Sequence, residues 1–231
     1  MKIVSCDNLP PEKIIALDDL LLKKAEHGEI GETIRFWESK EYFIVLGRSS
    51  KASDDCILDN CKKDTIKIIR RSSGGGTILQ GPGCLNYSLI LSYKKNEQLK
   101  SITSSYEIIL GKIAGKLREH GIPAQVKPIS DIAIENKKIS GNAQTRKKIY
   151  FLHHGTILFN FNLKKISLYL AHPPKEPSYR ESRKHLDFMT NIHITKEKIE
   201  ELLLSLYTPV GGSYELTSKD KNCLKTFILR A

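Results

Sequence analysis

The chain contains the stretch Arg70-Arg71-Ser72-Ser73-Gly74-Gly75-Gly76-Thr77, which follows the β-branched run 66–69. Glycine has no Cβ atom, so three glycines in succession allow unusual φ angles and a close approach of the backbone to a ligand. The two arginines beside them offer planar donor groups for a carboxylate or a phosphate. Neither Gly-Lys-Ser/Thr nor Gly-x-Gly-x-x-Gly is present, so this stretch is not a P-loop or a dinucleotide fingerprint. Taken alone, the glycine run is equally compatible with a flexible hairpin turn.

Two later segments carry further polar residues. The first runs from Ser130 to Ile134, turns at Asn136-Lys137 and continues as Lys138-Ile139-Ser140-Gly141-Asn142-Ala143-Gln144. The second reads Leu152-His153-His154-Gly155-Thr156-Ile157-Leu158. Because successive side chains of a strand point to opposite faces, the two adjacent histidines do not form a metal-binding pair.

Together, the three segments resemble the signature of the lipoate–protein ligase A family, which belongs to the biotin/lipoyl ligase and transferase fold. The match runs in the family's order over about 66–160. The resemblance implies an enzyme that activates lipoate with ATP, with Mg²⁺ as cofactor, and passes the lipoyl group from lipoyl-AMP to a lysine of an acceptor protein. The glycine stretch resembles the lipoate branch of this fold and not the biotin branch.

The resemblance also implies residue roles. Lys138 occupies the position of the family's essential lysine, which contacts the substrate carboxyl and the α-phosphate. The nucleotide side would be lined by Asp131, Lys138, Ser140, Gly141 and Ala143, and Asp131 would be a candidate ligand of Mg²⁺. The acid would be bound by Arg70, Arg71, Ser73, Gly74, Gly75, Gly76, Thr77, Asn86, His154 and Thr156.

The hydrophobic pattern independently predicts an α+β fold with a mixed, largely antiparallel sheet and flanking helices. Apolar residues at intervals of three and four predict helices over 11–27 and 102–120, which end near Gly28 and Gly121. Shorter helices are expected over 54–62, 163–170 and 195–206. Strands are expected over 34–37, 43–46, 66–69, 77–79, 86–91, 125–127, 131–135, 138–144 and 155–161. No repeat or linker interrupts the chain, so we expect one catalytic domain over 1–231.

Composition limits the class of protein further. No signal peptide or bilayer-length apolar run is present, which predicts a soluble cytoplasmic protein without a membrane partner. Five cysteines (Cys6, Cys56, Cys61, Cys84 and Cys223) at irregular spacing argue against a disulfide framework or a zinc site. The net charge of +11 predicts an anionic partner. Acidic lipoyl domains of 2-oxoacid dehydrogenases or glycine cleavage proteins fit this charge, whereas a basic tail or RNA-recognition pattern is missing.

Three departures from the family pattern concern the identity of the acid and the accessory parts. Gln80-Gly81 stands where lipoate ligases commonly have His-Asp, and Cys84 replaces the usual asparagine, with Asn86 nearby as a substitute. After the last expected helix only 208–231 remain, too few for the small C-terminal accessory domain of the longer ligases. Either a separate chain supplies that function or none is needed. Residues 173–183 resemble the family's capping loop, whose lysine and arginine approach the nucleotide.

Alternative functions therefore stay open at the level of sequence. A thiol-dependent octanoyltransferase would use Cys84, which lies upstream of the usual nucleophile position and is better explained as a buried structural thiol. A transferase that only consumes preformed lipoyl-AMP would need a partner for adenylation. A degenerate basic nucleic-acid-binding module is disfavoured because Lys138 and the glycine stretch are both retained.

Overall fold

A mixed sheet of eight strands forms the centre of the computed structural model, which describes residues 1–5, 9–207 and 211–228. The strand order is β11-β1-β2-β6-β10-β9-β8-β7. Strands β11, β1 and β2 run parallel to one another, and every other pairing in this sheet is antiparallel. The strands span Lys2–Ser5 (β1), Thr33–Trp37 (β2), Cys84–Ser92 (β6), Gln125–Lys127 (β7), Asp131–Ile134 (β8), Lys137–Arg146 (β9), Tyr150–Leu158 (β10) and Ser213–Glu215 (β11).

A second, three-stranded sheet carries the arginine–glycine stretch. Its order is β4-β3-β5, with β3 parallel to β4 and antiparallel to β5. The strands are β3 (Phe43–Leu46), β4 (Lys67–Arg70) and β5 (Ile78–Gln80), so the glycines connect β4 to β5. Three helices and the end of β10 share a hydrophobic cluster with this sheet: α2 (Ala52–Asp55), α3 (Leu58–Lys63) and α5 (Leu163–Tyr169).

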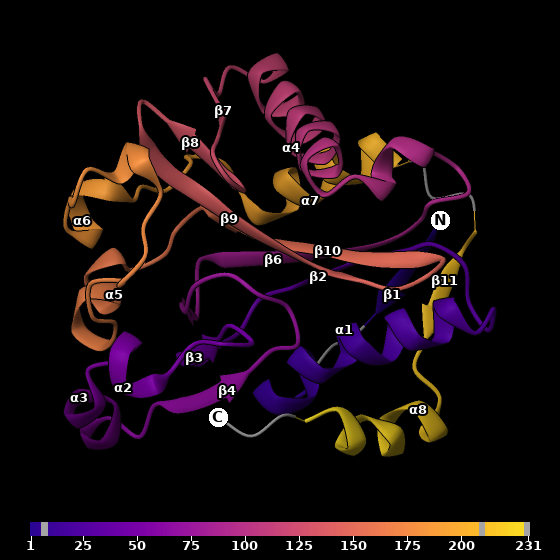
Figure 1. Cartoon of the computed structure of the whole chain (residues 1–231), viewed down its shortest axis with the longest axis horizontal. Coiled ribbons are helices and arrows are strands. Elements are labelled where there is room, and N and C mark those ends of the chain that lie inside the picture. Colours follow the sequence, from indigo (N-terminus) through magenta and orange to yellow (C-terminus); the bar gives the residue numbers. More distant parts are fainter. Residues whose placement is uncertain (6–8, 208–210, 229–231) are drawn as a thin grey trace.

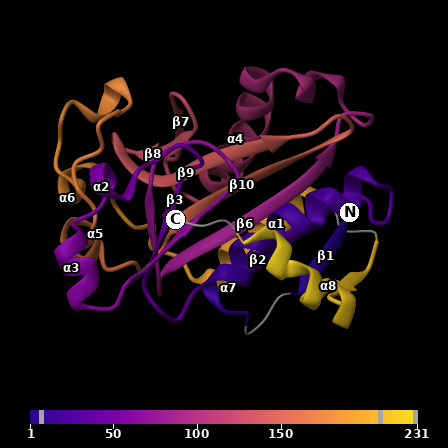
Figure 2. The ribbon, with the colours of Figure 1, turned by 60° about the horizontal axis from the view of Figure 1, so that its bottom comes forward.

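Helices cover both faces of the large sheet, as Figure 1 shows. On one face, α4 (Ile102–Glu119) and α7 (Lys196–Tyr207) bury their apolar residues against β6, β8, β9 and β10. On the other, α1 (Pro11–Glu26) packs through Leu17, Leu21 and Ala25, which share one helix face. Figure 2 shows α8 (Ser218–Cys223) beside α1, where Lys24 binds Asp220 at 2.8 Å. The remaining elements are α6 (His185–Phe188) and the 3₁₀ turns η1 (Glu97–Lys100), η2 (Ser178–Arg180) and η3 (Leu224–Phe227).

The predicted fold class is confirmed, and the differences concern element boundaries and short elements that were not predicted. The helix expected over 54–62 is two helices, because the backbone is extended at Cys56 between them. Strand β10 begins at 150 and ends at 158 instead of spanning 155–161, since it pairs with β6 over 150–158 and with β9 over 151–155. Strands β1 and β11 were not predicted. They are short, and their parallel pairing joins segments more than 200 residues apart.

None of the described helices is long and apolar enough to span a bilayer. Cys6 and the ends of the expected C-terminal tail, 208–210 and 229–231, lie outside the described residues.

Candidate active site

A cavity of about 400 Å³ lies where the glycine stretch, the sheet and the segment after α5 meet. On the sheet side it is lined by all five residues predicted for the nucleotide: Asp131, Lys138, Ser140, Gly141 and Ala143. The predicted acid-binding residues among its lining are Arg71, Gly75, Gly76, Thr77, Asn86, His154 and Thr156. Arg70, Ser73 and Gly74 are not among the lining residues. The three motifs, far apart in sequence, therefore converge on one cavity.

Lys138 and Asp131 form an ion pair across the β8–β9 hairpin. The Nζ atom of Lys138 lies 2.8 Å from Oδ1 of Asp131, with 25% of the lysine side chain and 8% of the aspartate side chain exposed. Gly141 stands opposite Asp131 in the strand register. A Cβ atom at Gly141 would lie 2.9 Å from both Cε and Nζ of Lys138, so the missing side chain leaves the room in which the lysine lies.

The second carboxylate oxygen of Asp131 is also occupied. The Tyr179 hydroxyl donates to Oδ2 at 2.8 Å, and burial followed by the nearby Asp131 charge raises the pKa of Tyr179 well above its ordinary value. Magnesium sites on proteins commonly use one or two carboxylates together with substrate phosphates. Here both oxygens of Asp131 accept from protein donors, and no cluster of three His, Cys, Asp or Glu suited to a metal occurs among the described residues. A carboxylate that accepts one hydrogen bond on each oxygen keeps lone pairs for a metal ion, so the role of Asp131 as a magnesium ligand stays a prediction.

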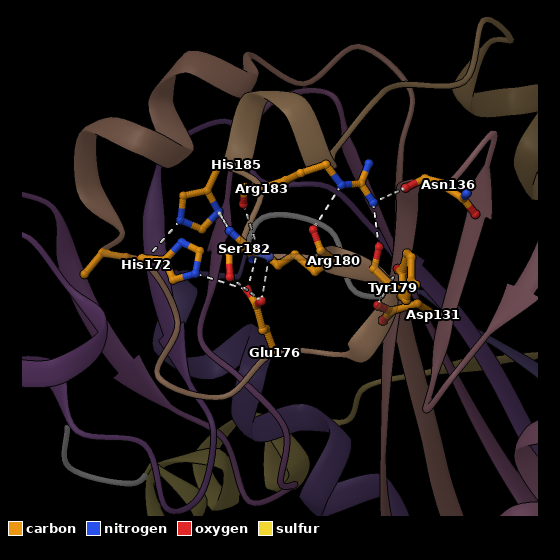
Figure 3. Close-up of polar contacts among 10 residues, drawn as sticks. Asp131, Asn136, His172, Glu176, Tyr179, Arg180, Ser182, Arg183 and His185 are labelled. Atoms are coloured by element: carbon orange, nitrogen blue, oxygen red, sulfur yellow. Dashed lines mark hydrogen bonds and ion pairs between the residues drawn. The ribbon is translucent and has the colours of Figure 1, made fainter.

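Residues 171–189, which we call the strap, contribute part of the cavity lining. Figure 3 shows the polar contacts within the strap and between the strap and the β8–β9 hairpin. Two guanidinium groups lie close to the ring of Phe188, with the Cζ atom of Arg180 4.8 Å and that of Arg183 5.3 Å from the ring centroid. Arg183 also donates to the carbonyls of Tyr179 at 2.6 Å and Asn136 at 3.0 Å, which joins the strap to the β8–β9 turn. Stacking of a cation on an aromatic ring contributes on the order of 1 kcal/mol, so this packing favours one strap conformation.

Hydrogen bonds and ion pairs of Glu176 join the other part of the strap. Its carboxylate accepts the backbone N–H of Ser182 at 2.8 Å and lies 3.3 Å from Nε of Arg180 and 3.0 Å from Nε2 of His172. The Ser182 contact and the Arg180 charge lower the pKa of Glu176 despite some cost of desolvation. Of the cationic residues expected to approach a nucleotide from this segment, Lys175 and Arg180 line the cavity.

Arg71 holds the glycine stretch from within. Its Nη2 donates to the carbonyls of Gly74 at 2.7 Å and Gly76 at 2.8 Å, and its Nε donates to Oγ of Ser73 at 2.9 Å. Burial lowers the pKa of Arg71 to about 10, which leaves the guanidinium charged at neutral pH. Most of its donors therefore serve the loop, although the predicted role was that of an anion ligand.

Arg70 supports the loop from outside the cavity. Its Nη1 lies 2.9 Å from the carbonyl of Gly47 and 2.7 Å from that of Ser50. A Cβ atom at Gly47 would lie 2.0 Å from the carbonyl oxygen of Gly75, so the glycine stretch rests directly on this second loop. The predicted contact of Arg70 with an anionic substrate has no counterpart in the cavity lining, because the guanidinium is directed to the 47–50 backbone.

A buried amide pair stands where the family pattern is broken. Gln80 and Asn86 exchange two hydrogen bonds, at 2.7 and 2.8 Å, and both side chains line the cavity. Cys84 lies beside them with 2% of its surface exposed, and burial raises the pKa of its thiol far above the ordinary value. The side chain of Asn86 is thus hydrogen-bonded to Gln80, and its contact with a substrate stays a prediction.

Two residues of the cavity region were missed by the sequence analysis. Asp18 of α1 lines the cavity and is 6% exposed, and Arg35 of β2 lies 2.8 Å from it with 1% of its side chain exposed. The signal was present, because each is a charged residue at a position that the apolar periodicity assigns to the core. Opposite charges at two such positions indicate a buried ion pair.

The fold matches solved lipoate ligase structures. A bi-partite lipoate protein ligase from Thermoplasma acidophilum, solved in a study that includes its E2 lipoyl domain, superimposes with a TM-score of 0.80 at 21% identity, over 97% of this chain and 90% of that one. A lipoate-protein ligase A bound with ATP gives a TM-score of 0.75 at 23% identity, over 97% and 92% of the two chains. At these identities the similarity establishes the architecture.

Residues 10–202 match the model of the lipoyl protein ligase A/B catalytic domain, and the chain belongs to this family. A probable lipoate-protein ligase A of Mycoplasma pneumoniae is 34% identical over 155 residues, which cover 67% of this chain and 44% of the relative. An octanoyltransferase LipM of Oceanobacillus iheyensis is 28% identical over 205 residues, covering 81% of this chain and 75% of the relative. The match thus spans under half the length of the Mycoplasma protein, and the names of these relatives divide between ligase and octanoyltransferase.

Proposed function

We propose that the chain activates lipoate with ATP to lipoyl-AMP and transfers the lipoyl group to a lysine of an acceptor lipoyl domain. The observation that carries this proposal is the placement of Lys138. Its ammonium lies in the cavity lining together with Gly75 and Gly76, and its counter-ion is the single carboxylate of Asp131. An ammonium group at this place neutralises the two anions, a carboxylate and a phosphate, that must meet before adenylation.

The first reaction forms a mixed anhydride. A carboxylate oxygen of the acid attacks the α-phosphorus of ATP, and the bond from that phosphorus to pyrophosphate breaks. Negative charge increases on the phosphoryl oxygens in the transition state, where Lys138 donates. A preorganised donor of this kind contributes roughly 3 kcal/mol to the lowering of the barrier. The strand backbone at Ser140, Gly141 and Ala143 provides the nucleotide wall that positions the phosphate.

The second reaction forms the amide. The acceptor lysine amine attacks the acyl carbonyl, the carbonyl–oxygen bond to AMP breaks, and the amine loses a proton. No covalent acyl-enzyme is needed, which agrees with the state of the thiols. Desolvation keeps Cys84 protonated, and it raises the pKa of Cys56 to about 12. A nucleophilic cysteine requires the opposite shift.

Two relatives motivate an alternative donor. The similarity to the octanoyltransferase LipM motivates octanoyl transfer, and the description of the archaeal ligase of this fold as bi-partite motivates an arrangement in which a second chain takes part. The +11 charge fits acidic lipoyl domains of 2-oxoacid dehydrogenase or glycine cleavage proteins in all three cases.

The test is to incubate the chain with ATP, Mg²⁺, lipoate and an apo lipoyl domain, and to measure the intact mass of the acceptor. An ATP-dependent lipoyl mass gain that is lost in Lys138→Ala supports the ligase. A gain only from preformed lipoyl-AMP indicates dependence on a partner chain. A gain from octanoyl-acyl-carrier protein without ATP, abolished by Cys84→Ser, supports the thiol-dependent transferase instead.

A further inference from the structure

A buried chain of hydrogen bonds connects helix α1 to the glycine stretch. It begins at Asp18, whose Oδ1 accepts from Nε of Arg35 at 2.8 Å and whose Oδ2 lies 2.9 Å from Nδ1 of His154. The other nitrogen of His154, Nε2, lies 2.7 Å from Oγ of Ser73. Ser73 in turn accepts from Nε of Arg71. Each of these side chains is buried except His154, which has 18% of its side chain exposed.

Two groups, the Arg71 guanidinium and the Asp18 carboxylate, can only donate or only accept, and they determine which atom donates in each hydrogen bond between them. Arg71 is a guanidinium and only donates, so Oγ of Ser73 is an acceptor toward it. Burial opposes ionisation of Asp18, but Arg35 and the His154 contact outweigh that cost and hold the pKa of Asp18 at about 2. Asp18 is therefore a carboxylate that only accepts. The hydrogen of a neutral His154 then belongs on Nδ1, and Nε2 is left to accept the hydroxyl hydrogen of Ser73.

In this network Arg71 consequently donates to Ser73, Ser73 to His154 and His154 to Asp18. The same Arg71 holds the carbonyls of Gly74 and Gly76, which form the loop beside the cavity. None of the three family motifs includes Asp18, which is connected to the loop through His154, Ser73 and Arg71.

We propose that Asp18 is a positioning residue of this site: its carboxylate fixes the tautomer of His154 and, through Ser73 and Arg71, the conformation of the glycine stretch. The kinetic part of the inference rests on the proposed acid activation, whereas the tautomer and the loop conformation do not. The role differs from that of Lys138, since Asp18 acts through three other residues.

The substitution Asp18→Asn preserves the shape of the side chain and reverses the direction of the hydrogen bonds from residue 18 through His154 to Ser73. Arg35 only donates, so the amide oxygen faces Arg35 and the amide nitrogen faces His154. Nδ1 must then accept, the ring hydrogen moves to Nε2, and Nε2 donates to Ser73. Oγ of Ser73 then faces two donors, and its own hydroxyl hydrogen loses its acceptor. Arg71 and the loop carbonyls it holds must shift in response.

The tautomer is measured by long-range ¹H–¹⁵N NMR of the full chain, with His154→Gln used to assign the signal. We expect the Nδ1–H form in the unsubstituted chain and the Nε2–H form in Asp18→Asn, together with faster amide exchange at Gly74–Gly76. The rate of acid-dependent ATP–pyrophosphate exchange should fall about 10²-fold, the effect of displacing a positioning group by roughly 1 Å.

Two further variants separate this role from a loss of stability. Ser73→Ala breaks the hydrogen-bond network beyond His154 and leaves the Asp18–Arg35 pair intact. It should therefore reduce the rate of ATP–pyrophosphate exchange and leave His154 in the Nδ1–H form. Asp18→Asn leaves the buried guanidinium of Arg35 without its counter-ion, and the double variant Asp18→Asn/Arg35→Gln removes that charge. If the double variant regains thermal stability but not the rate of ATP–pyrophosphate exchange, the result supports a positioning role for Asp18.

Three results would overturn the inference: an Nε2–H form in the unsubstituted chain, an unchanged tautomer in Asp18→Asn, or unchanged loop exchange after the tautomer has reversed. If the unsubstituted chain shows no acid-dependent exchange, the proposed ligase function fails, while the NMR and amide measurements still decide the role of Asp18.

Discussion

The room above Gly141 allows the position of Lys138 to be tested without removing its charge. In Gly141→Ala, the new Cβ would lie 2.9 Å from Nζ and Cε of Lys138. Ordinary van der Waals contact begins at 3.4 Å, so the ammonium must move by at least about half an ångström. The contact is with the end of a flexible side chain, and the backbone of β9 can therefore remain in place.

The expected loss follows from the displacement. A misplacement of about 1 Å costs roughly 10²-fold in rate, so half of that costs about tenfold, or about 1.4 kcal/mol of barrier. The assay is lipoate-dependent ATP–pyrophosphate exchange at saturating substrates, with thermal unfolding measured in parallel. Gly111→Ala is the matched control. Nothing lies within 4 Å of a Cβ at Gly111 of α4, so this variant should keep its rate and gain about 0.5–1 kcal/mol of stability.

The prediction fails if Gly141→Ala retains full exchange activity with an unchanged unfolding temperature. A rate loss accompanied by an equal loss in folded fraction would equally refute the reasoning, because the substitution would then act through stability. A tenfold loss in a fully folded variant, beside an unaffected Gly111→Ala, is the result we expect.

Further predictions concern the same cavity. Lys138→Ala should reduce the adenylation rate about 10²–10³-fold in a folded chain, measured by pyrophosphate exchange, because one preorganised donor is lost. Cys84→Ser should retain ligase activity in the acceptor mass assay, and complete loss there would indicate thiol chemistry. Tyr179→Phe removes the hydroxyl donor to Asp131 and should cost about 1 kcal/mol of stability in urea unfolding, with no effect if the contact does not form in solution. The folded-state pKa of Asp18 is below its unfolded value of 3.8, so its contribution of about 2 kcal/mol is present above pH 4 and lost as pH falls toward 2. Asp18→Asn should flatten the pH dependence of the unfolding free energy in that window.

The elements of the fold that could be predicted are those with strong local periodicity. Helices α1 and α4 follow their apolar repeats to within a residue or two, and strand β3 has the predicted bounds. Strands β1 and β11 could not be predicted in this way, since three- and four-residue strands carry little pattern of their own. Their pairing depends on contacts between the two ends of the chain, which no local window contains.

Most of the predicted site residues line the cavity, because the sequence motifs indicate which residues lie near one another. Lys138 and Asp131 were predicted on the nucleotide side, and the structure brings them within 2.8 Å of each other. What motifs do not report is the direction of each side chain. Arg70 and Arg71 look alike in sequence, yet one is directed to the 47–50 backbone and the other to the glycine carbonyls. Asp18 was missed because its significance depends on a histidine 136 residues away.

The carboxylate of Asp131 is shared between two parts of the molecule. One oxygen holds the ammonium of Lys138 on the sheet, and the other holds the hydroxyl of Tyr179 on the strap. An anionic ligand that binds the ammonium of Lys138 therefore changes the charge environment of the same carboxylate that anchors the strap. Thermodynamic linkage requires the effect to be reciprocal: any factor by which an anionic ligand strengthens or weakens the strap contact is the factor by which that contact changes the affinity for the ligand. Occupancy of the cavity and order of the strap are in this sense one equilibrium observed at two places.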